Sequence, residues 1–444
     1  MAFARFKRSG TMNPEISERE KSHSSFAELA AEECIVLLKN ENILPLPLFA
    51  PIALLGSGAD KTVKGGIGSG DVNNRQNITI YEGMAESGIQ ITSRDWLDNY
   101  EHRYQEARLI WKEKILEEAK HVDNPFDAYA SNPFIMPEGR PVSEKDIEGA
   151  SAAVYVISRI SGEGKDRRLE KGDYYLSERE EEDILFLNSR QVPIILLINA
   201  GGPVELTDIL EKTQWIKGIF NISQLGQEGG RAVARILLGE AVPSGKLTTT
   251  WAKKYADMPF AENFSYLNGN LELEEYKEGI YIGYRYFDSF GVKPLFPFGF
   301  GLSYTDFEIQ FCGIEIDQDK IEVNVSVENT GSRFSGSEVV QIYAVLPHGR
   351  LEKEHHRLVR YAKTNVLKPG EKQQVRILIE GKALASFFEE DHAWIVEAGN
   401  YELWIGNSSD NLKLEALVKV NGDTVLEKTR KLETAAESWR DHTL

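Results

Sequence analysis

Short apolar runs that alternate with helical patterns constrain the fold of this chain more than any other feature. The apolar runs are residues 51–56, 152–157, 192–198 and 215–222. Segments with helical patterning lie beside them, at 25–39, 79–87, 95–119, 177–187 and 231–238. Continuous apolar runs are typical of parallel strands buried on both faces, and their alternation with helices is typical of a wound α/β sheet. We therefore predict a mostly parallel sheet, sandwiched by helices, over residues 25–252.

The pattern changes at about residue 306, where apolar and polar residues begin to alternate with a period of two. Runs of this kind occupy 321–328, 338–345, 374–379 and 401–406, and turn sequences such as Lys368-Pro-Gly separate them. They predict an antiparallel β-sandwich of immunoglobulin type over 306–420, without its disulfide. The remaining parts are then a polar N-terminal arm (1–24), a connecting segment (253–305) and a charged tail or linker (421–444).

Charge and cysteine usage exclude several classes of function. The chain has 51 basic and 69 acidic residues, a net charge of −18, which argues against binding to nucleic acid or to an anionic membrane surface. With only Cys34 and Cys312, neither a disulfide framework nor a thiolate metal site is expected. His355-His356 has no partner at metal-ligand spacing, so no metal is expected there either. No apolar run could span a bilayer and no signal-peptide pattern follows Met1, which favours a cytoplasmic location.

The loop after the run 152–157 is the strongest candidate for a functional site. It reads Ser161-Gly-Glu-Gly-Lys-Asp-Arg167 and leads to a helix with Ser177 at its N-cap and Glu180 at the capping-box position. In an open α/β sheet, loops that leave the carboxyl ends of strands bind ligands. The glycines on either side of Glu163 allow close approach of the backbone to a ligand. We therefore predict a ligand-binding loop centred on Glu163.

Two other motifs have weaker functional signals. Gly65-Gly-Ile-Gly-Ser-Gly70 lacks the spacing of a dinucleotide fingerprint and is followed by no Walker lysine, so a phosphate or dinucleotide cradle is not favoured and a plain turn remains open. Gly226-Gln-Glu-Gly-Gly-Arg231 opens the helical pattern at 231–238, and Glu228 suits a helix N-terminus. For this second motif, packing of a helix start is the favoured interpretation.

The ordered set of motifs resembles the C-terminal half of glycoside hydrolase family 3, the β-glucosidase family. The residues that carry the resemblance are Ala31-Glu-Glu-Cys-Ile-Val-Leu-Leu-Lys-Asn-Glu-Asn-Ile-Leu-Pro-Leu46, Lys64-Gly-Gly-Ile-Gly-Ser-Gly-Asp71, Ser161–Arg167, Gly226–Arg231, Pro243-Ser-Gly-Lys-Leu247, Gly283-Tyr-Arg-Tyr-Phe-Asp288 and Phe298-Gly-Phe-Gly-Leu-Ser-Tyr-Thr305. The sandwich is similar to the fibronectin type III-like domain that commonly follows, through Val327-Glu-Asn-Thr-Gly331, Glu338-Val-Val-Gln-Ile-Tyr343 and Leu367-Lys-Pro-Gly-Glu371. The resemblance covers residues 25 to 420.

The resemblance implies hydrolysis of terminal β-D-glycosidic, most simply β-glucosidic, bonds by a retaining mechanism that needs no cofactor. It implies that Glu163 is the general acid/base, and that an oligosaccharide or aryl β-glycoside is the substrate. Lys165, Asp166 and Arg167 are candidate substrate-binding residues from the same loop. The resemblance also implies that the glycine-rich loop borders the sugar site or the domain interface, which adds Gly66, Gly68 and Ser69 as further candidates, with a plain turn as the equal alternative. Asp166 would raise the pKa of Glu163 and the basic neighbours would lower it, and the sequence leaves the balance open.

The chain departs from the family in one respect. The family's nucleophile is an aspartate on a (β/α)8 barrel, which needs at least about 200 residues, and nothing before Ala31 provides them. Ser93-Arg-Asp-Trp96 imitates the family's Ser-Asp-Trp nucleophile motif, but it opens a charged helix, so we reject it. We expect the front part of an enzyme with reversed domain order, whose barrel is supplied downstream or by another chain, and a homo-oligomer is compatible with this. The alternative is a non-catalytic carbohydrate-binding or assembly module.

Overall fold

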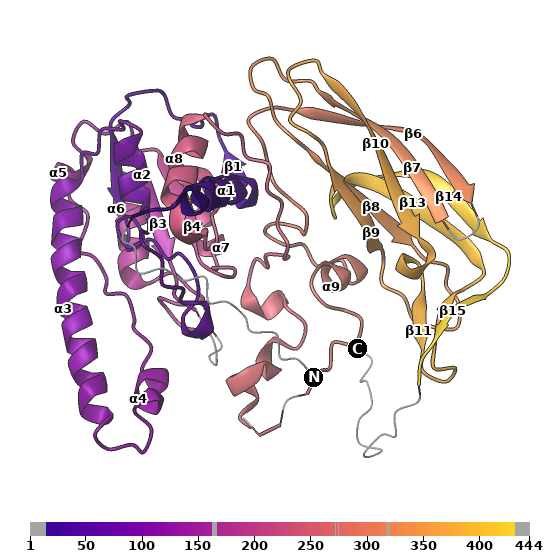
Figure 1. Cartoon of the computed structure of the whole chain (residues 1–444), viewed down its shortest axis with the longest axis horizontal. Coiled ribbons are helices and arrows are strands. Elements are labelled where there is room, and N and C mark those ends of the chain that lie inside the picture. Colours follow the sequence, from indigo (N-terminus) through magenta and orange to yellow (C-terminus); the bar gives the residue numbers. More distant parts are fainter. Residues whose placement is uncertain (1–14, 162–166, 271, 274, 318–319, 431–444) are drawn as a thin grey trace.

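The computed structural model describes residues 15–430 apart from 162–166, 271, 274 and 318–319. Figure 1 shows two layered units with a connecting segment between them, which carries the short helix α9 (Tyr284–Ser289). Helices and a sheet form the N-terminal unit at the left, and a β-sandwich forms the C-terminal unit at the right. Within the described ranges, no helix has the length and apolar character needed to cross a membrane.

A five-stranded mixed sheet forms the centre of the N-terminal unit. Its order is β1-β5-β4-β3-β2, with β1 (Val36–Asn40), β2 (Ile52–Leu55), β3 (Ala152–Ser158), β4 (Ile194–Asn199) and β5 (Ile216–Asn221). Strands β2 to β5 pair in parallel, and β1 pairs antiparallel to β5 at the edge. Every residue of β2, β3 and β4 is buried, as expected of strands covered on both faces. The predicted fold class is confirmed.

Helices cover both faces of this sheet (Figure 1). Their bounds are α1 (Glu18–Cys34), α2 (Ile80–Glu86), α3 (Arg94–Glu118), α4 (Pro125–Ser131), α5 (Glu144–Ile147), α6 (Glu178–Ser189), α7 (Thr207–Lys212) and α8 (Gly229–Leu238). Helices α2 and α8 pack backbone to backbone, because a Cβ on Gly230 would lie 2.0 Å from the carbonyl oxygen of Thr79. No larger residue fits there without moving one of the two helices.

Two helices start outside the helical segments that the sequence predicts. Helix α1 begins inside the predicted arm, because the Ser17 hydroxyl accepts from the amide of Glu20 at 3.3 Å and the Glu20 carboxylate accepts from the amide of Ser17 at 2.8 Å. This capping box satisfies two amides at the helix start. Helix α4 interrupts the proline-bearing stretch 123–141, with the Asn124 side chain as cap and Pro125 at the first helical position. Proline suits that position because it needs no amide hydrogen bond.

The C-terminal unit is an antiparallel sandwich, as predicted. One sheet is β10-β7-β6, with β6 (Phe307–Asp317), β7 (Lys320–Asn329) and β10 (Lys372–Glu380). The other is β14-β13-β8-β9, with β8 (Val339–Val345), β9 (Arg357–Lys363), β13 (Gly399–Ser408) and β14 (Asn411–Val420). A small third sheet joins β11 (Ser386–Phe388), β12 (Ala393–Val396) and β15 (Thr424–Lys428). Strand β15 lies in the predicted charged tail, where pairing with β12 outweighs its polar composition.

Aromatic and polar contacts join the two units. The ring of Tyr284 in α9 lies 4.9 Å from that of Phe298 and 5.8 Å from that of Tyr343 in β8. Lys246, which follows α8, forms a 2.7 Å ion pair with Glu338, directly before β8 of the sandwich. The side chain of this lysine is 12% exposed and that of the glutamate 8%. The junction is therefore a packed interface that holds the connecting segment in place.

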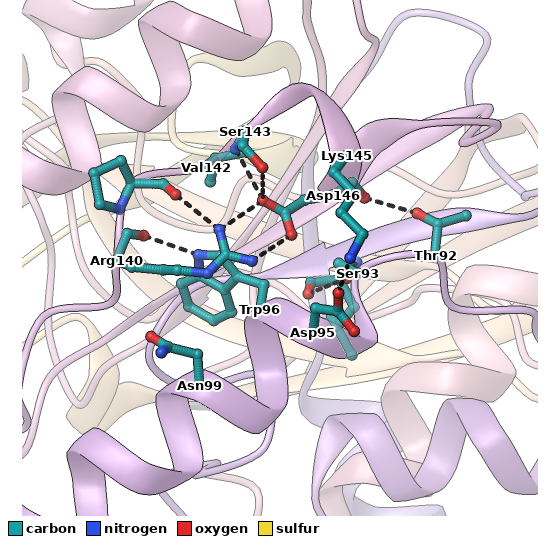
Figure 2. A network of polar contacts seen from close by, with 12 residues as sticks. Thr92, Ser93, Asp95, Trp96, Asn99, Arg140, Val142, Ser143, Lys145 and Asp146 are labelled. Atoms are coloured by element: carbon teal, nitrogen blue, oxygen red, sulfur yellow. Dashed lines mark hydrogen bonds and ion pairs between the residues drawn. The ribbon is translucent and has the colours of Figure 1, made fainter.

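The Ser93-Arg-Asp-Trp96 motif has a structural role, which supports its rejection as a nucleophile site (Figure 2). The Ser93 hydroxyl accepts from the amide of Leu54 at 2.8 Å and donates to its carbonyl oxygen at 2.7 Å. The indole of Trp96 donates to the carbonyl oxygen of Arg140 at 2.9 Å. Figure 2 also shows the bidentate pair of Arg140 with Asp146, at 2.8 and 2.6 Å. The hydrogen bond from Trp96 and the ion pair with Asp146 both hold Arg140, which lies in the segment before β3.

Asp183 in α6 should make the stability of this unit depend on pH. Burial raises the pKa of its carboxyl group from 3.8 to about 6, although it accepts from the amide of Val142 at 3.0 Å and from the hydroxyl of Tyr155 at 3.1 Å. The folded state therefore keeps a proton that the unfolded chain releases. The free energy of unfolding should fall by about 1–3 kcal/mol as the pH rises from about 4 to about 6. Asp183→Asn should remove this loss, which urea unfolding at a series of pH values would measure.

Asp146 is a control for which the pKa shift, and therefore the pH dependence of stability, has the opposite sign. Burial would raise the pKa of its carboxyl group, but hydrogen bonds from Arg140 and Ser143 lower it overall. Asp146→Asn should therefore remove stability that is present above the unfolded pKa and lost in acid. An Asp183→Asn variant whose stability falls with pH as steeply as that of the wild type would contradict the assignment to Asp183.

Candidate functional site

The predicted ligand loop leaves the carboxyl end of β3 and returns to the start of α6. Glu163, Lys165 and Asp166 lie outside the described residues, whereas Ser161 and Arg167 on either side of them are described. The described part of the site therefore consists of the two ends of the loop and the elements that hold these ends.

Arg159 anchors the first end of the loop. It is 6% exposed, and its guanidinium forms a bidentate pair with Glu180 in the first turn of α6, at 2.8 and 2.7 Å. It also donates to the carbonyl oxygens of Ser158 at 2.8 Å, Asp173 at 2.7 Å and Tyr175 at 3.1 Å. Because arginine presents its donors in a rigid planar fork, one side chain can fix several segments at once. Arg159 thus joins the end of β3 to both the returning loop and α6.

Arg167 anchors the other end. Its Nε donates to the carboxylate of Asp173 at 2.7 Å, and its Nη atoms donate to the carbonyl oxygens of Asp173 and Pro203, each at 2.6 Å. Arg159 and Arg167 therefore share one acceptor, the carbonyl oxygen of Asp173. We call the set Arg159, Glu180, Arg167 and Asp173 the arginine clamp. It holds Arg159 and Arg167, which lie on either side of residues 160–166, to the same carbonyl oxygen.

The arginines at the two ends of the loop are paired with carboxylates. Each guanidinium has a carboxylate of its own, Glu180 for Arg159 and Asp173 for Arg167, and Arg168 lies 3.4 Å from Glu170. Paired charges act less strongly on a neighbouring carboxyl group than free ones. The sequence predicts Arg167 as a substrate-binding residue, whereas the contacts made by its nitrogens in the structure are with the protein itself.

The glycine-rich loop after β2 lies directly beside the loop after β3. The amide of Ile67, between the predicted site residues Gly66 and Gly68, donates to the carbonyl oxygen of Ser161 at 3.1 Å. Gly68 has a φ of +79° and opens a short 3-10 helix (Gly68–Gly70) that includes Ser69. A left-handed φ of this kind favours glycine. The structure therefore brings the backbone of this loop to the edge of the candidate site.

Asn199 at the end of β4 joins the loops of three strands. It is 1% exposed, and its Oδ1 accepts from the amide of Val63 at 2.8 Å and from the hydroxyl of Ser158 at 2.9 Å. Its Nδ2 donates to the carbonyl oxygens of Val63 at 2.9 Å and Ser223 at 2.7 Å. These four hydrogen bonds use both donors and both acceptor lone pairs of the side-chain amide. Arg159, Asp173 and Asn199 are not among the site residues predicted from the sequence, although a polar residue directly after an apolar run is a signal that could have found Asn199.

Two cavities flank the loop after β3. One, of about 560 Å³, lies on the β2 side and is bordered by Gly56, Ser57 and Ser161. The other, of about 740 Å³, lies on the β4 side and is bordered by Gly202, Pro203 and the connecting segment. Arg167 and Arg168 line both. Arg167 and Arg168 therefore lie between a cavity lined by many charged residues at the ends of β2 and β3 and a cavity with several aromatic residues next to β4.

Glu228 packs the start of α8, in line with the favoured interpretation of its motif. It is fully buried and accepts from the side chains of Ser24, of Gln76 at 3.0 Å and of Arg231 at 2.5 Å. These contacts join α1, the segment before α2 and α8. Within the described part of the chain, no group of three or more His, Cys, Asp and Glu side chains could hold a metal ion.

Comparison with known proteins gives the same fold and the same order of domains. Residues 35–304 match the glycosyl hydrolase family 3 C-terminal domain, and residues 338–409 match a fibronectin type III-like domain. Beta-glucosidase A of Butyrivibrio fibrisolvens is 34% identical, covering 90% of this chain and 52% of that protein. Thermostable beta-glucosidase B of Acetivibrio thermocellus is 31% identical, covering 94% of this chain and 51% of that protein.

A solved structure extends the likeness to three dimensions. Beta-glucosidase 3B from Thermotoga neapolitana, in complex with alpha-D-glucose, superposes with a TM-score of 0.79 at 37% identity, covering 93% of this chain and 56% of that one. The chain thus spans about half the length of these relatives. The match to the family's C-terminal domain covers more than half of the 444 residues, and the chain therefore belongs to glycosyl hydrolase family 3.

Proposed function

We propose that the chain supplies the acid/base half of a β-glucosidase active site. In this proposal Glu163 protonates the leaving oxygen of a terminal β-glucoside and then activates the water that releases the sugar. A carboxylate on a (β/α)8 barrel, either in the rest of the protein or in another chain, attacks the anomeric carbon. The reaction needs no cofactor.

The arginine clamp is the structural observation that carries this proposal. A retaining glycosidase requires its two carboxyl groups about 5–5.5 Å apart on opposite sides of the scissile bond. A group that must meet a partner on a different domain at that distance needs a loop with fixed ends. Arg159 and Arg167 provide this by donating to the same carbonyl oxygen, that of Asp173, at 2.7 and 2.6 Å. Family membership and the relatives named as β-glucosidases support the same assignment.

Reconstitution with a barrel tests the proposal. The chain by itself should not hydrolyse 4-nitrophenyl β-glucoside, because it carries one of the two carboxyl groups. Joined to or mixed with the barrel encoded next to it, it should turn over this substrate with retention of configuration at the anomeric carbon. Release of the α-anomer as the first product, detected by proton NMR, would contradict a retaining mechanism.

The non-catalytic alternative makes a different prediction for the same experiment. If no adjacent reading frame encodes a barrel with a Ser-Asp-Trp motif, and the chain binds sugars or a partner without turnover, the carbohydrate-binding or assembly role is the correct one.

A further inference from the structure

An exposed apolar stripe lies along the second half of α3. Leu109 and Leu116 are 62% and 56% exposed, and Ile110 beside them is 61% exposed. Leu109 and Leu116 are seven residues apart, which is about two helical turns, so they lie on the same face of the helix. The buried side chains of Trp96 and Tyr100 lie on the opposite face. Apolar side chains that gather on an exposed surface in this way indicate an interaction site more strongly than scattered ones do.

The position of α3 leaves this stripe open to another molecule. Figure 1 shows the helix along the edge of the N-terminal unit, on the side away from the sandwich. Its second half packs on the rest of the chain through Trp111, whose ring meets that of Tyr129 in α4 with centroids 5.9 Å apart. The indole of Trp111 also donates to the carbonyl oxygen of Asn132 at 2.7 Å. These contacts hold the helix from the face opposite to the stripe.

Exposed charges of opposite sign flank the stripe on its two sides. A period of 3.6 residues places two basic residues, Arg108 and Lys112, on one side. It places three acidic residues on the other side: Glu106, Glu113 and Glu117. A partner with a uniformly acidic or basic surface would be attracted by one flank and repelled by the other. A second copy of the same helix offers each flank its opposite, so the surface is complementary to itself.

We propose that two copies of the chain associate through this stripe, with their α3 helices parallel and related by a two-fold axis. In a parallel pair the basic flank of each helix meets the acidic flank of the other, so Lys112 faces the partner's Glu113. An antiparallel pair would instead place basic flank against basic flank. Leu109 and Leu116 each pack on the same residue of the second copy and supply the apolar contact. This interface is independent of the proposed function.

The dimer should be weak, because the stripe is short. The helix rises only about 17 Å between Glu106 and Glu117. A helix pair of this length buries less than about 1,200 Å², the lower limit of stable interfaces. The net charge of −18 on each copy adds repulsion. We therefore expect a monomer at a chain concentration of about 1 μM and a substantial fraction of dimer at about 100 μM.

Sedimentation equilibrium of the full chain, at concentrations from about 1 to about 300 μM, tests the proposal. The average mass of the wild type should rise over this range from that of the monomer towards that of the dimer. Leu109→Lys should weaken the dimer about tenfold or more, because it places two like charges against each other at the centre of the interface. Leu417→Lys is the matched control, since Leu417 is a leucine on β14 that is 66% exposed, and it should dimerise like the wild type.

A charge swap tests the parallel arrangement. Lys112→Glu and Glu113→Lys should each weaken the dimer about threefold to tenfold, because each places like charges across the two-fold axis. The double variant restores an opposite pair and should recover part of the loss. Melting temperatures should stay close to that of the wild type, because both side chains are exposed. A wild type that stays monomeric, Leu109→Lys that dimerises like the wild type, or a double variant that associates no better than the single variants would overturn the proposal.

Discussion

Replacing Glu163 by glutamine in the reconstituted enzyme should lower kcat/KM for methyl β-glucoside by about 10²–10⁴-fold. Glutamine keeps the size of the side chain but cannot donate a proton to the leaving oxygen. The loss should be much smaller for 2,4-dinitrophenyl β-glucoside in the first step, because this leaving group departs without protonation. The dependence of the rate on the pKa of the leaving group should therefore become steeper in the variant. Initial rates over a series of aryl glucosides measure this directly.

A matched control lies on the same loop. Glu170 is an exposed glutamate whose side chain pairs with Arg168 at 3.4 Å, so Glu170→Gln removes the same charge from the same segment and should leave the leaving-group series unchanged. Added azide should restore turnover of the dinitrophenyl substrate in Glu163→Gln by attacking the glycosyl-enzyme without base assistance. Equal losses across all leaving groups, with no effect of azide, would mean that Glu163 has a role other than proton transfer.

The alternation of apolar runs and helices was enough to predict the architecture, because burial of both sheet faces leaves a chain of this pattern few other solutions. The same kind of local signal placed the start of α6, where the Glu180 carboxylate accepts from the amide of Ser177 at 2.8 Å. That carboxylate has a second role that local patterns do not encode, since it also accepts from Arg159 at 2.7 Å. Which of many charged residues meet across a loop depends on the tertiary fold. The sequence therefore indicates a candidate loop but not the residues that hold its ends.

The cavity on the β4 side could not be predicted from the sequence for the same reason, because it too depends on the tertiary fold. Its aromatic residues come from the loop after β3, the connecting segment and α9, and no spacing rule relates these segments. The connecting segment is polar with scattered aromatic residues, and this composition predicts only an irregular chain.

Arg159→Met should be the most destabilising single change at the candidate site, lowering the free energy of unfolding by about 3–5 kcal/mol. It leaves the carboxylate of Glu180, which is 8% exposed, buried without its bidentate partner. It also removes the hydrogen bonds that Arg159 donates to the carbonyl oxygens of Asp173 and Tyr175 at 2.7 and 3.1 Å. Urea unfolding of the chain measures the loss. Arg140→Met is the matched control, since Arg140 forms a bidentate pair with a buried carboxylate, that of Asp146, before β3 rather than after it.

Comparison with Arg140→Met distinguishes a loss of stability from a loss of positioning of the loop that carries Glu163. Both variants should unfold more easily, but under conditions where both are folded only Arg159→Met should lower kcat, by about 10²-fold, because the loop that carries Glu163 loses its fixed end. The double variant Arg159→Met with Glu180→Met sharpens the distinction. Apolar side chains of similar volume can replace a buried ion pair at little cost in stability, so the double variant should recover most of the lost stability. It cannot restore the hydrogen bonds to Asp173 and Tyr175, so its kcat should stay low. Recovery of kcat together with stability would show that the clamp acts on folding alone, because the only property restored would be the packing of α6 against β3.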